Sequence, residues 1–490
     1  MGFFDIRDIG RIRREKVVRC GIWLSVIVLL TIVMFLLRFL NVNYIAYKVC
    51  ILVSLAGFIC ELVAVFLESD RRITPLMLFL IAFYGFQNGQ ILLWAFGINF
   101  NAFYLLYLQE HLNDAIIFTS VCNLWAGFAG MLCSSPRRDL DRVRIAPQDR
   151  YDRRLIYRSL GIACVVLGVV IIPMVLAKFA VAMLEGYTGV RALEERIPSV
   201  LTFLEYMFAP FCMAFICYFG TQKIGRLAAA VLLGYFALTA FCGDRTTGIA
   251  GLFVTLYLFY FLEHDRKKRL RMVGVLAGAC VVLLFLLQIV HTVRNQESLG
   301  SLSLRLWDVV VDSVWEIGFS FFPLMAMMEI VPASESFLFG RQYLQSVVGG
   351  IFPASVDPTG TVAKINAASR VFESWEAEYF SYFDFGLGFS LNAEGYINFG
   401  CFGFLSVFLI CLLVAFFLNR YQRYEENSVF PKYAACVLLF LWFTLPRRDS
   451  YYVWKALVYS VVLVMVYLWL TCSAWRKRAG RGHEDTNEIV

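Results

Sequence analysis

Long apolar segments recur along the chain and constrain its fold more than any other feature. A transmembrane helix needs about 20 consecutive, mostly apolar residues, and hydropathy averaged over about 19 residues finds many segments of roughly that length. They are residues 21–37, 44–67, 75–96, 115–132, 160–184, 200–219, 227–241, 247–262, 272–290, 396–418, 433–445 and 453–472. Segments 227–241, 247–262 and 433–445 are the shortest. We therefore predict an all-α polytopic membrane protein with about 12 transmembrane helices.

The composition supports the same class. Of the 490 residues, 60% are hydrophobic and only 17% are charged, whereas soluble domains carry about 25% charged residues. This excludes a water-soluble enzyme. The 14 cysteines lie almost all in apolar stretches, so we expect small buried hydrophobic residues rather than a disulfide framework.

The distribution of basic residues predicts the orientation. Twelve spans place both termini on one side, and the segments on that side hold 30 of the 44 Lys and Arg residues. Because cytoplasmic loops retain positive charge, we expect cytoplasmic termini and interpret the net charge of +7 as topology rather than nucleic-acid binding. The first apolar segment is followed by Arg38 without a small-residue cleavage site, which predicts an uncleaved span.

One connection is much longer than the others. We divide the chain into residues 1–293 with nine spans, an external loop at 294–389, residues 390–475 with three spans, and a charged cytoplasmic tail at 476–490. The loop carries Trp307, Trp315, Trp375 and Tyr379, so we expect it to be ordered. Its stretch 304–322 has helical apolar spacing and is expected to lie along the membrane surface or over the bundle. Five basic side chains against eleven acidic ones exclude a generally phosphate-attracting loop surface.

Six cations fall near the predicted external face, where the membrane makes charge costly. They are Lys48, Lys178 and Lys455 near the ends of spans, Arg245 in the short turn CGDRTT, and Arg447 and Arg448 in LPRRDS. Snorkelling lysines, lipid headgroup binding, or ion pairs with Asp244 or Asp449 would each explain some of them. Since a guanidinium presents a donor fork that matches phosphate oxygens, a sharper hypothesis is an outward-opening cavity for the pyrophosphate of a lipid-linked substrate.

The densest motif is GLGFSLNAEGYINFGCFGF at residues 386–404. Its glycines permit close backbone approach or helix packing. Glu394 stands near the start of a membrane helix, where a carboxylate can serve as a cap that the helix dipole favours, although Asn392 could serve instead. If Glu394 faces a cavity, it could accept a proton from a sugar hydroxyl, and Tyr396 and Asn398 could hydrogen-bond the sugar.

Other site chemistries find little support, so neither a metal nor a cofactor is expected. The four histidines have no zinc-site spacing, and no P-loop or dinucleotide-binding motif is present. His111 and His291 are candidate bases, or else interfacial residues. The acidic stretch with Glu373, Glu376, Glu378 and Asp384 could hold a divalent ion or a sugar, but a solvated loop face is the simpler interpretation.

Together these motifs resemble the Wzy-type O-antigen and capsule polymerases of bacteria. The resemblance rests on GDRTT, the long external loop, GLGFSLNAEGYINFGCFG leading into a span, and a late PRRDS. It covers the whole chain as architecture, although the motifs occupy only about forty residues. The fold that it implies is similar to the GT-C-like polymerase and ligase class, in the bacterial inner membrane.

The resemblance implies a metal-independent inverting transfer that lengthens a glycan on undecaprenyl pyrophosphate and releases that carrier. Glu394 would deprotonate or orient the acceptor hydroxyl, and Arg245 would act with it at the catalytic centre. The residues that would bind pyrophosphate or sugar are Arg191, Arg341, Arg447, Arg448, Lys455, Tyr396 and Asn398. The implied partners are undecaprenyl-pyrophosphate-linked oligosaccharides, membrane lipids, a chain-length regulator and a flippase, with no nucleic acid.

Three alternatives remain open. A lipid-linked oligosaccharide flippase or another transporter would also suit twelve spans, but transporters commonly show internal repeats and a site near the bilayer midplane. The related O-antigen ligases use a loop histidine as base, and residues 294–389 contain none. A non-catalytic assembly or chain-length partner is disfavoured by the charges inside the spans.

Overall fold

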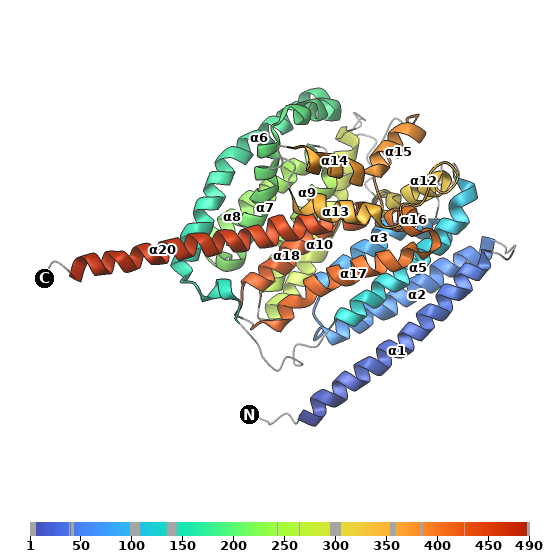
Figure 1. Ribbon diagram of the computed structural model, residues 1–490, viewed down its shortest axis with the longest axis horizontal. Helices are drawn as coiled ribbons and strands as arrows, with labels where there is room; N and C mark the ends of the chain where they lie inside the picture. The colour runs from blue at the N-terminus through green and yellow to red at the C-terminus, as the bar shows by residue number, and fades with distance from the viewer. Residues whose placement is uncertain are drawn as a thin grey trace. The chain divides into compact units, whose positions relative to one another are not determined.

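Every regular element that the structure describes is a helix, as the sequence predicts (Figure 1). The structure is a computed structural model and describes residues 6–38, 40, 44–98, 108–134, 145–242, 244–263, 265–294, 305–352, 359–382, 386–425 and 427–487. Within these residues, 11 helices are long and apolar enough to cross a membrane. The chain is therefore a multi-pass membrane protein.

The chain divides into two compact units. The first unit contains Met1–Arg142, Val311–Gln422 and Leu445–Val453, and the second contains Val143–Val310, Arg423–Thr444 and Trp454–Val490. Each unit is thus assembled from segments that are far apart in the sequence. Each also has its own buried apolar side chains, such as Phe79 and Phe118 in the first unit and Phe208 and Tyr257 in the second.

Helix α5 is the centre of the first unit. It spans Gln109–Cys133 and packs against α1 (Ile6–Leu37), α2 (Tyr44–Glu68), α3 (Pro75–Ala95) and α17 (Gly403–Asn419). Figure 1 shows α1, α2, α5 and α17 lying side by side. Most side chains of α3 and α5 are buried. Helix α3 begins with Pro75 after Thr74, whose hydroxyl accepts a hydrogen bond from the Met77 N–H at 3.3 Å.

The sequence predicts that the stretch 304–322 lies along the membrane surface or over the bundle, but the structure places residues 306–322 in a longer and largely buried segment, Leu306–Ile330. It forms α11 (Leu306–Ile317), the 3₁₀ turn Gly318–Phe321 and α12 (Phe322–Ile330), and it is itself long and apolar enough to cross a membrane. From Val311 onward it packs within the first unit, where Gly318 meets Gly89 of α3 so closely that a Cβ at Gly318 would lie 2.6 Å from the Gly89 Cα. Two glycines at the crossing let the backbones approach and bury the segment.

The remaining elements of the first unit are short. They are α13 (Arg341–Ile351), α14 (Thr361–Ser369), α15 (Val371–Tyr379), α16 (Leu391–Phe399), the 3₁₀ turns Gly400–Phe402, Arg420–Arg423 and Leu445–Arg447, and α19 (Tyr451–Lys455). Some of them extend by a few residues into the second unit.

The predicted span 396–418 is broken into two helices. The chain turns at Gly400, whose φ of +57° favours glycine, and α17 begins at Gly403. A Cβ at Gly403 would lie 2.1 Å from the Gly395 carbonyl oxygen. The glycine-rich motif therefore does what the sequence suggests, because it brings α16 and α17 into backbone contact.

The second unit contains the other long helices. They are α6 (Arg153–Arg196), α7 (Ser199–Phe219), α8 (Lys223–Phe241), α9 (Arg245–Leu262), α10 (Arg266–Arg294), α18 (Phe430–Trp442) and α20 (Leu463–Asn487), with the 3₁₀ turn Pro147–Arg150 and a π-helical segment at Ala456–Val462. Helix α6 bends at Gly186, where φ is +70°. Helices α9 and α18 remain shorter than a typical span, as their sequences suggest.

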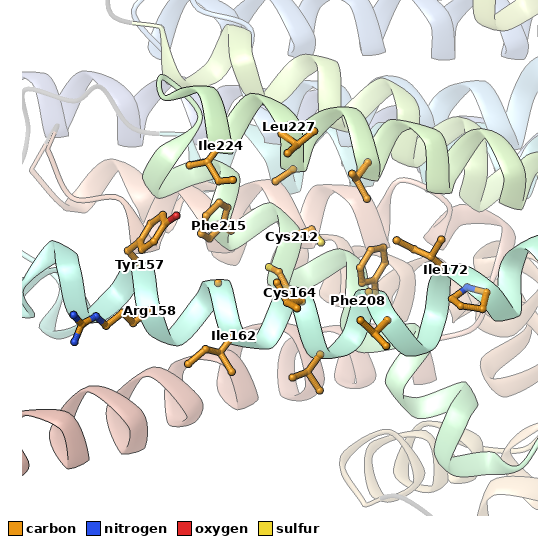
Figure 2. Close-up of a pocket in the computed structure, with 18 residues that line it drawn as sticks. Tyr157, Arg158, Ile162, Cys164, Ile172, Phe208, Cys212, Phe215, Ile224 and Leu227 are labelled. Carbon is orange, nitrogen blue, oxygen red and sulfur yellow. The ribbon is translucent and has the colours of Figure 1, made fainter.

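An apolar groove of about 950 Å³ lies along α6, α7 and α8 in the second unit (Figure 2). Cys164, Phe208 and Phe215 contribute to its lining, and Arg158 contributes at one end. Its lining includes none of the predicted site residues.

Candidate active site

Two motifs that lie far apart in the sequence meet in the first unit. Ser450 of the PRRDS turn donates its backbone N–H to Glu394 Oε2 at 2.8 Å and its hydroxyl to Glu394 Oε1 at 2.7 Å. Glu394 stands in the first turn of α16 and is 0% exposed. Both carboxylate oxygens therefore hold the turn that carries Arg447 and Arg448.

A second link runs through Gln87 of α3. The Ser390 hydroxyl, which caps the start of α16, donates to Gln87 Oε1 at 3.1 Å, and Gln87 Nε2 donates to the Pro446 carbonyl at 2.6 Å. Gln87 is 0% exposed. The sequence interpretation missed this residue, and the available signal was the group of amide side chains Gln87, Asn88 and Gln90 within a predicted membrane span.

Arg447 lies beside the glycine turn that precedes α16. Gly388 has a φ of +69°, and a Cβ there would lie 3.6 Å from Arg447 Nε. On the other side of the turn, the Glu376 carboxylate accepts a hydrogen bond from the Leu387 N–H. The turn at residues 386–390 thus lies between Arg447 and the Glu376 carboxylate, and these two contacts define its position.

Arg448 and Asp449 complete this cluster. The Arg448 guanidinium lies 4.4 Å from the centre of the Tyr452 ring, in cation–π contact. Asp449 is half-buried as a residue, and its Oδ1 is a buried atom without a hydrogen-bond partner among the described residues. Burial raises the pKa of the Asp449 carboxyl to about 7, although Arg448 and Arg370 act to lower it. Arg447, Arg448 and Asp449 are thus consecutive in a turn that Ser450 connects to the Glu394 carboxylate.

Asn398 links α16 to the start of α13. Its amide oxygen accepts the Gly340 N–H at 3.1 Å, and its amide nitrogen donates to Gln342 Oε1 at 3.1 Å. Arg341, the first residue of α13, is exposed. Asn398 is buried and supports the backbone from which Arg341 projects, whereas its predicted sugar contact stays a prediction.

Tyr396 is likewise engaged within the protein. Its hydroxyl donates to the Val331 carbonyl at 3.2 Å, and its ring is buried against Phe118 and Phe337. A direct role for Tyr396 in sugar binding also stays a prediction.

The remaining predicted cations belong mainly to the second unit. Lys455 lies 4.8 Å from the centre of the Tyr206 ring. The side chains of Arg191 in α6 and Arg245 at the start of α9 lie outside the described residues, as does that of His291. The convergence of all these cations on one substrate remains a prediction.

Lys178 has partners of its own in the second unit. Its ammonium group lies 3.0 Å from Glu205 and 3.2 Å from Glu194, and Lys178 is 7% exposed. Lys48, in the first unit, lies 5.2 Å from the centre of the Trp94 ring. Interactions within the protein therefore account for the positions of both lysine side chains.

The sequence also offered His111 as a candidate base and an acidic stretch as a candidate divalent-ion site. His111 lies 2.6 Å from Glu329. Among the described residues, no group of three or more His, Cys, Asp or Glu side chains is placed to hold a metal ion.

The fold and these motifs define a polytopic, all-helical membrane protein whose buried polar residues join two arginine- and carboxylate-bearing segments. Comparison with known families is more specific, because the model of the O-antigen polysaccharide polymerase Wzy family matches residues 22–479. The chain belongs to this family, which acts on lipid-linked oligosaccharide repeat units in membranes. No curated protein and no solved structure matches the chain.

Proposed function

We propose that this polymerase joins undecaprenyl-pyrophosphate-linked repeat units at the outer leaflet of the bacterial inner membrane, with both of its termini in the cytoplasm. The growing glycan is the donor, and a hydroxyl of an incoming lipid-linked repeat unit is the acceptor. A flippase would supply the repeat units, and a chain-length regulator would act on the same enzyme.

The reaction is a metal-independent inverting glycosyl transfer. The acceptor oxygen forms a bond to the anomeric carbon while the bond from that carbon to pyrophosphate breaks, and the electron pair leaves with undecaprenyl pyrophosphate. Arg447 and Arg448 would stabilise the charge that develops on the leaving group, since fixed guanidinium groups bind phosphate oxygens without reorganisation. Arg191, Arg245, Arg341 and Lys455 are further candidates for this task. A carboxylate of the Glu394–Asp449 pair would take the acceptor proton.

The observation that carries this proposal is the double hydrogen bond from Ser450 to Glu394. These hydrogen bonds connect a turn that carries arginines to a helix that carries a carboxylate. Arginine and carboxylate are the two kinds of group that the transfer needs. A proton-coupled glycan flippase would also use carboxylates, so the activity of the purified protein and the phenotype of a deletion strain distinguish the two functions.

Purified protein in detergent tests the proposal. Given lipid-linked repeat units and a chelator, and no nucleotide sugar, wild-type protein should produce longer lipid-linked glycans, measured by mass spectrometry. Arg447→Ala should reduce polymer at least about 100-fold, whereas Arg154→Ala, an exposed arginine outside both motifs, should leave it unchanged. A requirement for nucleotide sugar or metal would reject the mechanism.

A deletion strain distinguishes the alternatives. Loss of a polymerase leaves single repeat units that are still transferred onward. Loss of a flippase leaves no repeat units on the outer side, and loss of a ligase leaves polymer that stays on the lipid carrier. Either of the last two results would reject the proposed function.

A further inference from the structure

The carboxylate of Glu394 is buried and already hydrogen-bonded within the protein, which does not suit a general base. A base must come within about 2.6–3.2 Å of the proton that it removes. Glu394 is 0% exposed, and each of its carboxylate oxygens already accepts a hydrogen bond from Ser450. A sugar hydroxyl could reach it only after both hydrogen bonds had broken and the PRRDS turn had moved.

Asp449, the residue before Ser450, is placed differently. The residue as a whole is half-buried, and its Oδ1, although itself buried, accepts no hydrogen bond from any of the residues described. It follows Arg448 directly in the turn whose position Ser450 and Glu394 define. Asp449 thus has a buried carboxylate oxygen that could accept a hydrogen bond from a sugar hydroxyl without another hydrogen bond being broken, which Glu394 lacks.

We propose that Asp449 accepts the proton of the acceptor hydroxyl, and that Glu394 is a positioning residue that holds Asp449 through Ser450. This inference rests on the proposed function. The acceptor proton moves to the Asp449 carboxylate as the acceptor oxygen forms its bond to the anomeric carbon, and the electron pair of the broken bond leaves with pyrophosphate. Asp449 then releases the proton to water.

The electrostatic surroundings of Asp449 suit this role. The charged groups that face it are Arg448 in its own turn, Arg370 and Glu373 at the start of α15, and Glu394 of α16. Burial raises the pKa of Asp449 to about 7, Glu373 adds to that rise, and the two arginines and the Tyr451 N–H oppose it. A base is most effective when its pKa lies near the working pH.

The Glu394→Gln variant separates positioning from proton transfer. A glutamine amide can accept the Ser450 N–H with its oxygen and donate its NH₂ to the Ser450 hydroxyl, which can act as acceptor. Both contacts to the turn then survive, but the side chain no longer accepts a proton. Glu394→Ala loses both contacts.

The inference is tested by the initial rate of polymerisation of the full-length protein, measured between about pH 5.5 and 8.5. General bases work best in this pH range. The wild-type rate should rise with a midpoint near 7, the pKa of Asp449. Asp449→Asn should lose at least about 100-fold and lose the inflection. Glu394→Gln should stay within about tenfold of wild type, and Glu394→Ala should fall further, both with the inflection retained.

Glu378→Gln changes an exposed carboxylate of α15 and serves as the control. Thermal unfolding in detergent should show that the variants are folded. If Asp449→Asn does not fold, the pH dependence of the rate is measured for Asp449→Glu instead. The longer side chain places the base differently and should shift the inflection. An unchanged inflection would overturn the inference. It would also be overturned if Glu394→Gln lost as much rate as Asp449→Asn. Wild-type protein that makes no polymer would instead overturn the proposed function, and the role of Asp449 with it.

Discussion

Ser450 and Glu394 are 56 residues apart in the sequence, yet Ser450 directs both its N–H and its hydroxyl at the two oxygens of the Glu394 carboxylate. This contact joins the turn before the last predicted span to the first turn of α16. Hydrogen bonds to a buried carboxylate are stronger than those between neutral groups. The orientation of Arg447, Arg448 and Asp449 therefore depends on a residue that lies in a different motif.

The stability of the protein should depend on the protonation of Asp449. Burial raises the pKa of Asp449 from 3.8 to about 7, so between these pH values the folded protein retains a proton that the unfolded chain has released. Stability should therefore fall as the pH rises through this window. Asp449→Asn, which resembles the protonated form, should raise the melting temperature at pH above 7 and leave it nearly unchanged at acidic pH. An equal effect at both pH values would contradict this account.

The turn before α16 should tolerate alanine at one glycine and not at the other. Gly388 has a φ of +69°, where an L side chain costs about 1–2 kcal/mol. Gly388→Ala should lower thermal stability and the rate of polymerisation, since the turn lies beside Arg447. Gly386→Ala is the matched control, because a Cβ there would make only an ordinary contact, 3.5 Å from Glu376 Oε1. Similar losses in both variants would show that backbone conformation is not the cause.

The contact between α16 and α17 should be sensitive to a single methyl group. A Cβ at Gly403 would lie 2.1 Å from the Gly395 carbonyl oxygen, so Gly403→Ala must push the two helices apart. Such overpacking typically costs about 1–3 kcal/mol. We expect a lower melting temperature and less protein in the membrane fraction. Gly21→Ala in α1, where a Cβ would have no neighbour within 4 Å, should change neither quantity.

Lys178 should prove to be structural. Its ammonium group pairs with Glu205 at 3.0 Å, and removal of one partner of a buried ion pair costs about 3–5 kcal/mol. Lys178→Met should therefore reduce membrane abundance strongly, and the double variant Lys178→Met, Glu205→Gln should recover much of it. If the double variant is no better than the single one, the pair is not what stabilises the second unit.

Features that depend on local composition could be predicted from the sequence. Hydropathy located most of the spans and the helical class, and the motifs indicated the family that the comparison then confirmed. The segment Leu306–Ile330 was the exception, because helical periodicity alone does not distinguish a surface helix from one buried through a glycine crossing. The contact between Gly89 and Gly318 decided its place.

The candidate site could be predicted only in part. The sequence identified the two motifs with Glu394, Arg447 and Arg448, because charged residues beside membrane spans stand out against apolar surroundings. It did not identify Gln87, and it treated Asp449 only as a partner for arginine. Hydrogen bonds such as Ser390–Gln87 join residues that are distant along the chain and leave no local pattern.

The amino-acid sequence alone determined that this chain crosses a membrane repeatedly as helices, because a bilayer requires long apolar segments whose backbone groups bond internally. It also determined where charge sits near those segments. Only the tertiary structure decided which of those charges meet, and that both Glu394 oxygens accept hydrogen bonds while the buried Asp449 Oδ1 has no partner among the described residues. The physical reason is that burial and hydrogen-bond partners are properties of packed helices, which residues far apart in the chain create together.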